Sequence, residues 1–113
     1  LQIQLAEEWV KVLGLESEKE IAFKNVTTAK QRLVLIARAM IKHPPLLILD
    51  EALINLDNQG TAIVVSLIHK IVKESGTTIL FVSHRYIDNL LPNCVYELIP
   101  TKYGSLGTIK QCI

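Results

Sequence analysis

The chain has 113 residues, half of them apolar, and its 12 basic and 11 acidic side chains leave a formal net charge of +1. This length suits one domain with a real core, and so balanced a charge gives no case for binding nucleic acid or an anionic membrane. No apolar run approaches the roughly 20 residues that span a bilayer and no secretory signal opens the chain, so we expect a cytoplasmic protein. Cys94 and Cys112 lie far apart without a C-x-x-C pair, which predicts idle thiols, neither a zinc site nor a disulfide.

Residues 1–13 carry apolar side chains at the spacing of one helix face, and Gly14 follows as a candidate residue for ending that helix. A chain that begins inside an amphipathic helix looks cut from something longer. Residues 16–20 are densely charged and predict a solvated turn.

A second helix is predicted to start near Ala29, because Thr28 and Gln31 fit the capping-box pattern. It should end before Pro44, since the residue before a proline is disfavoured in helical geometry. Unpaired amide groups at its N-terminus would make an anion site, where Thr27 and Thr28 offer hydroxyl groups. A helix cap with no ligand is an equal alternative.

Residues 46–49 form an all-apolar run that ends in two adjacent acids, Asp50 and Glu51. Such a run is typical of a buried parallel strand covered on both faces. In open parallel α/β sheets, ligand chemistry gathers at the carboxyl ends of the strands, where these acids would lie. The simpler alternative is that Asp50 only caps a following helix.

Asp57 can cap a further helix over residues 58–75, and a second apolar strand is predicted over 77–82, ending in Ser83 and His84. One helix between two strands is a βαβ crossover, which predicts parallel neighbouring strands. The two acids after the first strand and His84 should therefore emerge at the same edge of the sheet.

The C-terminal part predicts a short helical stretch over 85–91, followed by strands over 94–99 and 108–113. Residues 100–107 would join these strands as the loop of a β-hairpin. The predicted fold class is α/β, a mostly parallel sheet with flanking helices and a C-terminal hairpin.

An acid pair beside a histidine suggests hydrolysis or phosphoryl transfer, in which one acid holds magnesium and the other orients water. Such a site needs a cradle for the phosphates, usually G-x-x-x-x-G-K-S/T. The five glycines stand at positions 14, 60, 76, 104 and 107, and none precedes a lysine. The phosphate loop is therefore absent from these residues.

The order of these motifs resembles ATP-binding cassette (ABC) ATPases. That family has a phosphate loop, a glutamine loop, the L-S-G-G-Q signature, the Walker B strand, the D-loop and the histidine switch. The chain resembles the second half only, and a closer resemblance is to bacterial tandem cassette proteins of the molybdate-associated, photorepair type. The resemblance implies a partial P-loop NTPase-like domain in three parts. These are the end of the helical subdomain with the signature helix (1–43), Walker B to the histidine switch (44–91) and the hairpin (92–113).

The resemblance also implies roles for individual residues. Asp50 would coordinate Mg²⁺ through water, Glu51 would be the general base, and His84 would sense the terminal phosphate. Asp57 would be the D-loop aspartate. The signature, which reaches across a dimer to the partner's nucleotide, would be Val26, Thr27, Thr28, Ala29 and Lys30.

The sequence departs from the family pattern at several of these positions. Ala29 stands where the family has glycine, Lys30 where it has glutamine, and Ala52 where proline commonly follows the acid pair. A methyl group at Ala29 would weaken close backbone approach to a phosphate. Lys30 could compensate with its positive charge.

We therefore expect the C-terminal half of an ATPase that uses ATP and Mg²⁺ for transport or a related task. It would be cytoplasmic and peripheral to the inner face of the membrane. Without a phosphate loop, the 113 residues alone would not hydrolyse ATP. Expected partners are the missing N-terminal half or a second cassette and membrane subunits, with no nucleic acid. One alternative is a non-catalytic assembly module that self-associates through exposed sheet edges. Another, opposed by the lack of sustained heptads, is half of a chromosome-maintenance ATPase.

Overall fold

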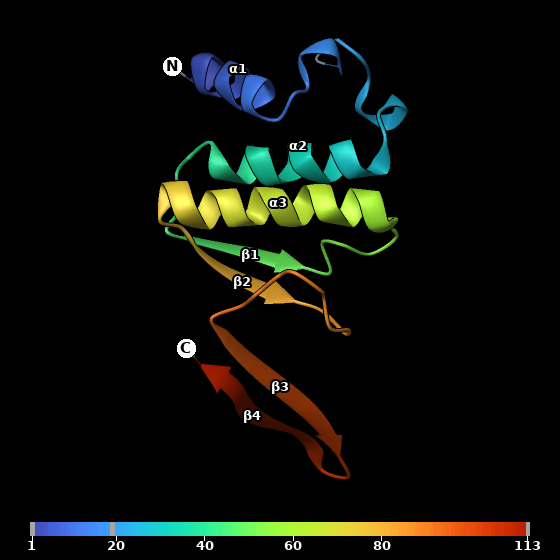
Figure 1. Ribbon diagram of the computed structural model, residues 1–113, viewed down its shortest axis with the longest axis vertical. Helices are drawn as coiled ribbons and strands as arrows, with labels where there is room; N and C mark the ends of the chain where they lie inside the picture. Colours follow the sequence, from blue (N-terminus) through green and yellow to red (C-terminus); the bar gives the residue numbers. More distant parts are fainter. Residues whose placement is uncertain (1, 19, 113) are drawn as a thin grey trace.

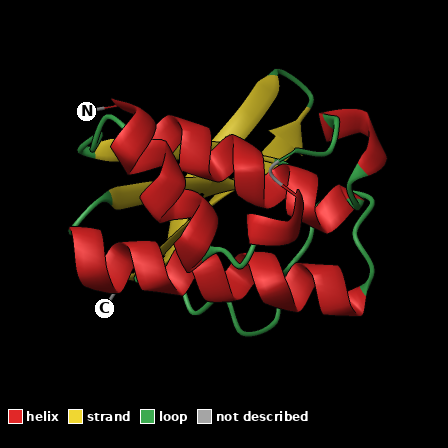
Figure 2. Cartoon of the chain, turned by 90° about the horizontal axis from the view of Figure 1, so that it is seen from above, coloured by secondary structure: helices red, strands yellow, loops and turns green. Residues whose placement is uncertain are grey.

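The computed structural model describes residues 2–18 and 20–112. In this part of the chain the elements are α1 (Gln2–Val12), η1 (Glu16–Glu18), η2 (Phe23–Asn25), α2 (Thr28–Met40), β1 (Leu46–Asp50), α3 (Asn58–Ser75), β2 (Thr78–Val82), β3 (Cys94–Thr101) and β4 (Gly104–Cys112). Figure 1 shows the α-helices stacked on one side of β1 and β2, with the β3–β4 hairpin projecting on the other side. Seen from the helical side in Figure 2, the helices lie in front of the strands.

β1 and β2 form a parallel pair, in register from Leu46 opposite Thr78 to Asp50 opposite Val82. α3 is the crossover between them, as one helix between two apolar strands predicts. A second sheet contains β3 and β4 in antiparallel pairing. The predicted α/β class, with flanking helices and a C-terminal hairpin, is confirmed.

The ends of α3 follow the predicted signals. The Asp57 side chain accepts a hydrogen bond from the Gly60 N–H at 2.7 Å, and Gly76 ends the helix with a φ of 67°. That left-handed conformation favours glycine, because a side chain there would crowd the backbone. No helix within the described ranges is long and apolar enough to cross a membrane.

α2 begins one residue earlier than predicted. Thr27 is the N-cap, and its hydroxyl accepts from the Lys30 N–H at 3.4 Å. The Gln31 side chain donates instead to the Phe23 carbonyl at 2.9 Å, which ties η2 to α2. The predicted capping box of Thr28 and Gln31 is therefore wrong, because Thr27 and not Thr28 is the N-cap residue.

The core lies between α2, α3 and the helical face of β1. Its most deeply buried side chains are Met40 and Val64, both 0% exposed, and Leu47 and Leu49 reach it from β1. Other members from the two helices are Leu33, Ile36, Val65, Leu67, Ile68 and Ile71. Burial of these apolar side chains holds the βαβ unit together.

The opposite face of β1 and β2 is open. Alternate residues of a strand point to opposite faces, so Ile48 and Leu80 lie away from the helices and are 58% and 52% exposed. Leu46 and Val82 are exposed beside them. The prediction that β1 is covered on both faces is therefore wrong for these residues, since helices of this chain cover one face only.

Residues 85–91 are not helical, contrary to the prediction. Asn89 and Leu91 have φ values of 66° and 52°, which a right-handed helix does not allow. The Asn89 carbonyl lies 2.7 Å from Nε2 of His69 on α3, and Ile87 is buried in the core. Contacts with α3 thus override the local helical pattern.

The hairpin is longer than predicted. β3 runs to Thr101 and β4 starts at Gly104, so the predicted loop over 100–107 is mostly strand. The prediction of idle thiols is also wrong, because Cys94 is disulfide-bonded. Cys94 and Cys112 are register partners, so the pairing of β3 with β4 brings these two positions opposite each other although they lie far apart in the sequence.

Candidate functional site

The site is built where β1 ends at the carboxyl edge of the parallel pair. The Glu51 N–H donates to the Val82 carbonyl at 2.9 Å, so the residue stays attached to β2 after β1 has finished. Its φ of 54° is unusual for a residue with a side chain. Such backbone strain is concentrated at functional sites, because the surrounding structure must hold it in place.

His84 lies directly against this acid. Its N–H donates to Oε1 of Glu51 at 3.0 Å, and its ring Nδ1 contacts the same oxygen. The His84 side chain is 93% exposed and the Glu51 side chain 28% exposed, so the pair is open to a ligand on the histidine side. The predicted meeting of the two residues at one sheet edge is confirmed.

Asp50 is the last residue of β1, lies opposite Val82 and is exposed. Within residues 2–18 and 20–112 there is no group of three or more His, Cys, Asp or Glu side chains that could hold a metal ion. Mg²⁺ commonly takes only one or two protein carboxylates and completes its shell with water and substrate phosphates. Asp50 therefore fits a Mg²⁺ ion that arrives with a nucleotide, and does not fit a permanent metal cage.

The segment after Glu51 is held by α2. The Arg32 guanidinium donates to the carbonyl oxygens of Ala52 at 2.8 Å and Ile54 at 3.1 Å. Asn55, next in the chain, has a φ of 64°. The role of Arg32 could not be predicted from the sequence, because its acceptors are backbone carbonyls and carry no side-chain signal.

The N-terminal ends of α2 and α3 lie side by side. A Cβ atom placed on Gly60 would be 3.2 Å from the Cβ of Ala29 and 3.1 Å from Oδ1 of Asp57. Thr27 and Thr28 are exposed, and Ala29 is partly buried. Asp57 and the signature-like residues of the sequence are thus neighbours in this chain.

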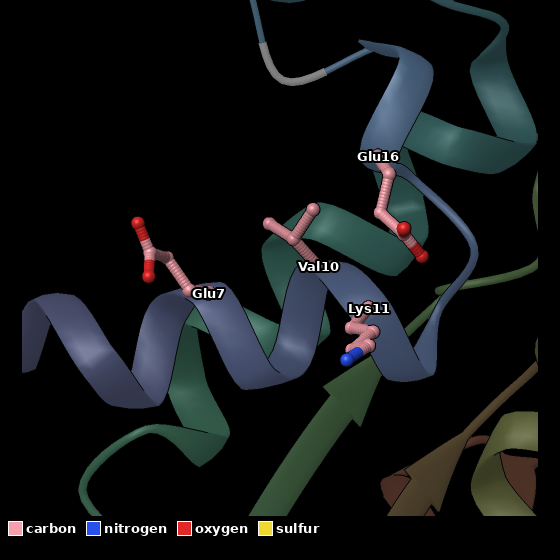
Figure 3. Close-up of a pocket in the computed structure, with 4 residues that line it drawn as sticks. All are labelled: Glu7, Val10, Lys11 and Glu16. Carbon is pink, nitrogen blue, oxygen red and sulfur yellow. The ribbon is translucent and has the colours of Figure 1, made fainter.

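One surface hollow, of about 230 Å³, includes two of the signature-like residues, Val26 and Lys30, among its lining residues. Figure 3 shows another, of about 250 Å³, lined by Glu7, Val10, Lys11 and Glu16. It belongs to α1 and η1, which Figure 1 places beyond α2 and α3 from the strands. Neither of these hollows is lined by Glu51 or His84.

No established family profile matches the chain. It is 38% identical over 103 residues to the ABC transporter ATP-binding protein ModF of Escherichia coli (strain K12), covering 88% of this chain and 21% of ModF. It is 32% identical over 107 residues to the energy-coupling factor transporter ATP-binding protein EcfA of Methanoculleus marisnigri, covering 93% of this chain and 38% of EcfA. The chain thus spans about a fifth of the length of ModF.

Two solved structures share the fold. An inward-facing metal-chelate type ABC transporter superposes with a TM-score of 0.68 at 20% identity, covering 94% of this chain and 56% of that chain. A structure of SMC ATPases superposes with a TM-score of 0.61 at 15% identity, covering 77% of this chain and 55% of that chain. These likenesses concern the fold alone, so they do not distinguish a transport ATPase from a chromosome-maintenance ATPase.

The fold is an α/β domain that carries an acid pair and a histidine at the ends of two parallel strands. The sequence relatives are ABC transporter ATP-binding proteins over most of the chain. The chain belongs to the ATP-binding cassette (ABC) ATPase family. Its similarity to ModF is compatible with the closer resemblance to molybdate-associated tandem cassette proteins.

Proposed function

We propose that the chain is the C-terminal half of an ABC ATPase and hydrolyses ATP together with a polypeptide that carries the phosphate loop. The observation that carries the proposal is the contact of the Glu51 carboxylate with His84, next to Asp50 at the end of β1. Within this half, residues 1–43 would supply the signature, 44–91 the catalytic edge and 92–113 a hairpin.

Glu51 would be the general base. Both contacts with His84 use Oε1, so Oε2 remains for the proton of an attacking water. A carboxylate in hydrogen-bond reach of water can take that proton as the water attacks phosphorus. The attachment of the Glu51 N–H to β2 supports this role, because it fixes the carboxylate relative to His84.

His84 would contact the terminal phosphate. The ring uses Nδ1 for its contact with Glu51, so Nε2 is the ring atom that would meet a phosphate oxygen. The high exposure of the ring leaves this side accessible. A donor held there would stabilise negative charge that develops during phosphoryl transfer.

Asp50 would hold Mg²⁺ through a water molecule. The ion, when bound, would neutralise charge on the phosphate oxygens. Val26, Thr27, Thr28, Ala29 and Lys30 would offer hydroxyl and amide donors to the nucleotide of a second cassette. The N-terminus of α2 supports this role, because the positive end of the helix dipole favours an anion. Asp57 would belong to the D-loop between the two sites.

The open face of β1 and β2 supports an incomplete domain. Four exposed apolar side chains, those of Leu46, Ile48, Leu80 and Val82, lie on a face that parallel sheets normally bury. We propose that the N-terminal half of the cassette covers this face.

The relatives are named for the import of different substrates, such as xylose and taurine, so the similarity does not identify a substrate for this chain. We propose that the protein works beside membrane subunits at the cytoplasmic face of the membrane.

The exposed apolar face also supports a second candidate, a non-catalytic module that self-associates. An uncovered sheet edge and face can pair with another copy. Sedimentation velocity over a wide concentration range distinguishes the two candidates. A monomer at every concentration would exclude the self-associating module, whereas a concentration-dependent dimer that binds no phosphate-loop polypeptide would favour it.

The proposed ATPase is tested by turnover with and without the missing loop. The purified 113 residues are expected to release no phosphate from ATP above background. Addition of the natural polypeptide that contains G-x-x-x-x-G-K-S/T should produce turnover, and Glu51→Gln in this chain should remove it. Turnover by the 113 residues alone that is lost in Glu51→Gln would show that the proposed division of labour is wrong.

A further inference from the structure

Ala29 and Gly60 face each other across the N-terminal ends of α2 and α3. A Cβ at Gly60 would lie 3.2 Å from the Ala29 Cβ, closer than carbon atoms in ordinary contact. Gly60 is buried, so an alanine there would require the Ala29 methyl group and the Asp57 carboxylate to shift. The methyl group of Ala29 therefore occupies the space that an alanine at position 60 would need.

The same contact defines the direction of the Ala29 methyl group. It is directed toward α3, whereas Thr27 and Thr28 at the start of α2 are exposed. Successive side chains on a helix point about 100° apart, so the exposed threonine side and the Ala29 side differ. The methyl group therefore lies on the α3 side of α2, away from the exposed threonine side.

We propose that Ala29 and Gly60 are a matched positioning pair, which sets the spacing between the signature helix and the D-loop helix. In this chain the alanine stands in for the usual glycine without obstructing the signature, because a glycine on α3 makes room for it. The link to ATP rests on the function proposed above. The pairing itself rests on the packing of α2 against α3.

The spacing matters because each helix end carries a cap. Thr27 accepts from the Lys30 N–H, and Asp57 accepts from the Gly60 N–H at 2.7 Å. An alanine at position 60 would crowd both the Ala29 methyl group and Oδ1 of Asp57. A glycine at position 29 would leave two glycines facing each other and remove the contact that holds the helix ends apart.

The pairing is first tested in the 113-residue chain by a double-mutant cycle in urea. Ala29→Gly should raise the equilibrium constant for unfolding about threefold or more, by lost packing and lower helix propensity. Gly60→Ala should be less stable than its gain in helix propensity predicts, because of crowding against Ala29 and Asp57. For the double variant, the equilibrium constant for unfolding should be at least about twofold lower than the two single-variant effects predict together. Ala39→Gly, on an exposed site of α2, is the control for helix propensity. Additive effects would overturn the pairing.

The effect of the Ala29–Gly60 pair on the proposed signature is tested by ATP turnover of the ATPase that contains this chain. The temperature is one at which circular dichroism shows every variant folded. Ala29→Gly restores the family's glycine, yet it should lower kcat about threefold or more and leave KM for ATP within about twofold. Adding Gly60→Ala should recover part of kcat. A higher kcat in Ala29→Gly would mean that the methyl group obstructs the phosphate, and would overturn the proposal. If the unaltered protein does not hydrolyse ATP, the proposed function fails, and the unfolding cycle still decides the pairing.

Discussion

Glu51→Gln is expected to lower ATP turnover by the intact ATPase about a hundred- to ten-thousand-fold, the usual contribution of a positioned general base. Glutamine keeps the length of the side chain, and its amide oxygen can still accept the His84 N–H that Glu51 accepts at 3.0 Å. It cannot take a proton from water. Steady-state phosphate release would therefore collapse while ATP binding, measured by equilibrium titration, persists.

A matched control for this substitution is Glu74→Gln, which removes an exposed carboxylate on α3. It should leave ATP turnover within about twofold of that of the unaltered protein, since an exposed substitution outside the proposed site changes little. If Glu51→Gln also stays within that range, Glu51 is not the base. Loss of ATP binding along with turnover would show instead that the acid holds the site together.

The sheet edge could be predicted because each of its parts has a local signal. The apolar run before Asp50 predicts β1, and Asp57 and Gly76 mark the ends of α3. A crossover through one helix makes β1 and β2 parallel, so their carboxyl ends lie at the same edge. His84 is therefore expected at the edge that carries Glu51, whereas the contact of its ring with Oε1 of Glu51 is seen only in the structure.

Other features depend on contacts that sequence patterns do not encode. Residues 85–91 have a helical pattern, but the buried Ile87 and the contact between His69 and the Asn89 carbonyl set another backbone path. The hairpin was predicted with too long a loop, because glycine at position 107 suggested a turn. In the structure Gly107 lies in β4 against the ring of Tyr96, where a Cβ would clash with the ring and its hydroxyl group.

The apolar run of β1 illustrates a different limit. Its all-apolar composition predicts burial on both faces, yet Leu46 and Ile48 are exposed in this chain. An apolar run indicates that a strand favours burial, but it does not say which polypeptide covers it. The difference between the predicted burial and the observed exposure is the reason that we propose a covering partner.

Arg32→Ala is expected to lower the free energy of unfolding by about 2 to 4 kcal/mol, because hydrogen bonds from a charged donor contribute about 1.5 to 3 kcal/mol each. Arg32 makes two such bonds, to the carbonyls of Ala52 and Ile54, and water can replace part of the second. Urea denaturation of the 113-residue chain measures the loss. Arg38→Ala, an exposed arginine on the same helix, should change it by less than about 0.5 kcal/mol.

Arg32→Lys distinguishes the contribution of hydrogen-bond geometry from that of the positive charge at position 32. Lysine keeps the charge but lacks the planar fork that reaches two carbonyls at once, so about half of the loss should remain. The Glu51 and His84 amide signals in NMR spectra should shift in Arg32→Ala and stay in place in Arg38→Ala, because Arg32 fixes the segment that follows Glu51. An Arg32→Ala protein as stable as Arg38→Ala, with unmoved signals, would show that the two hydrogen bonds do not hold this segment. α2 and the segment after β1 would then be held together only by the packing of their shared core.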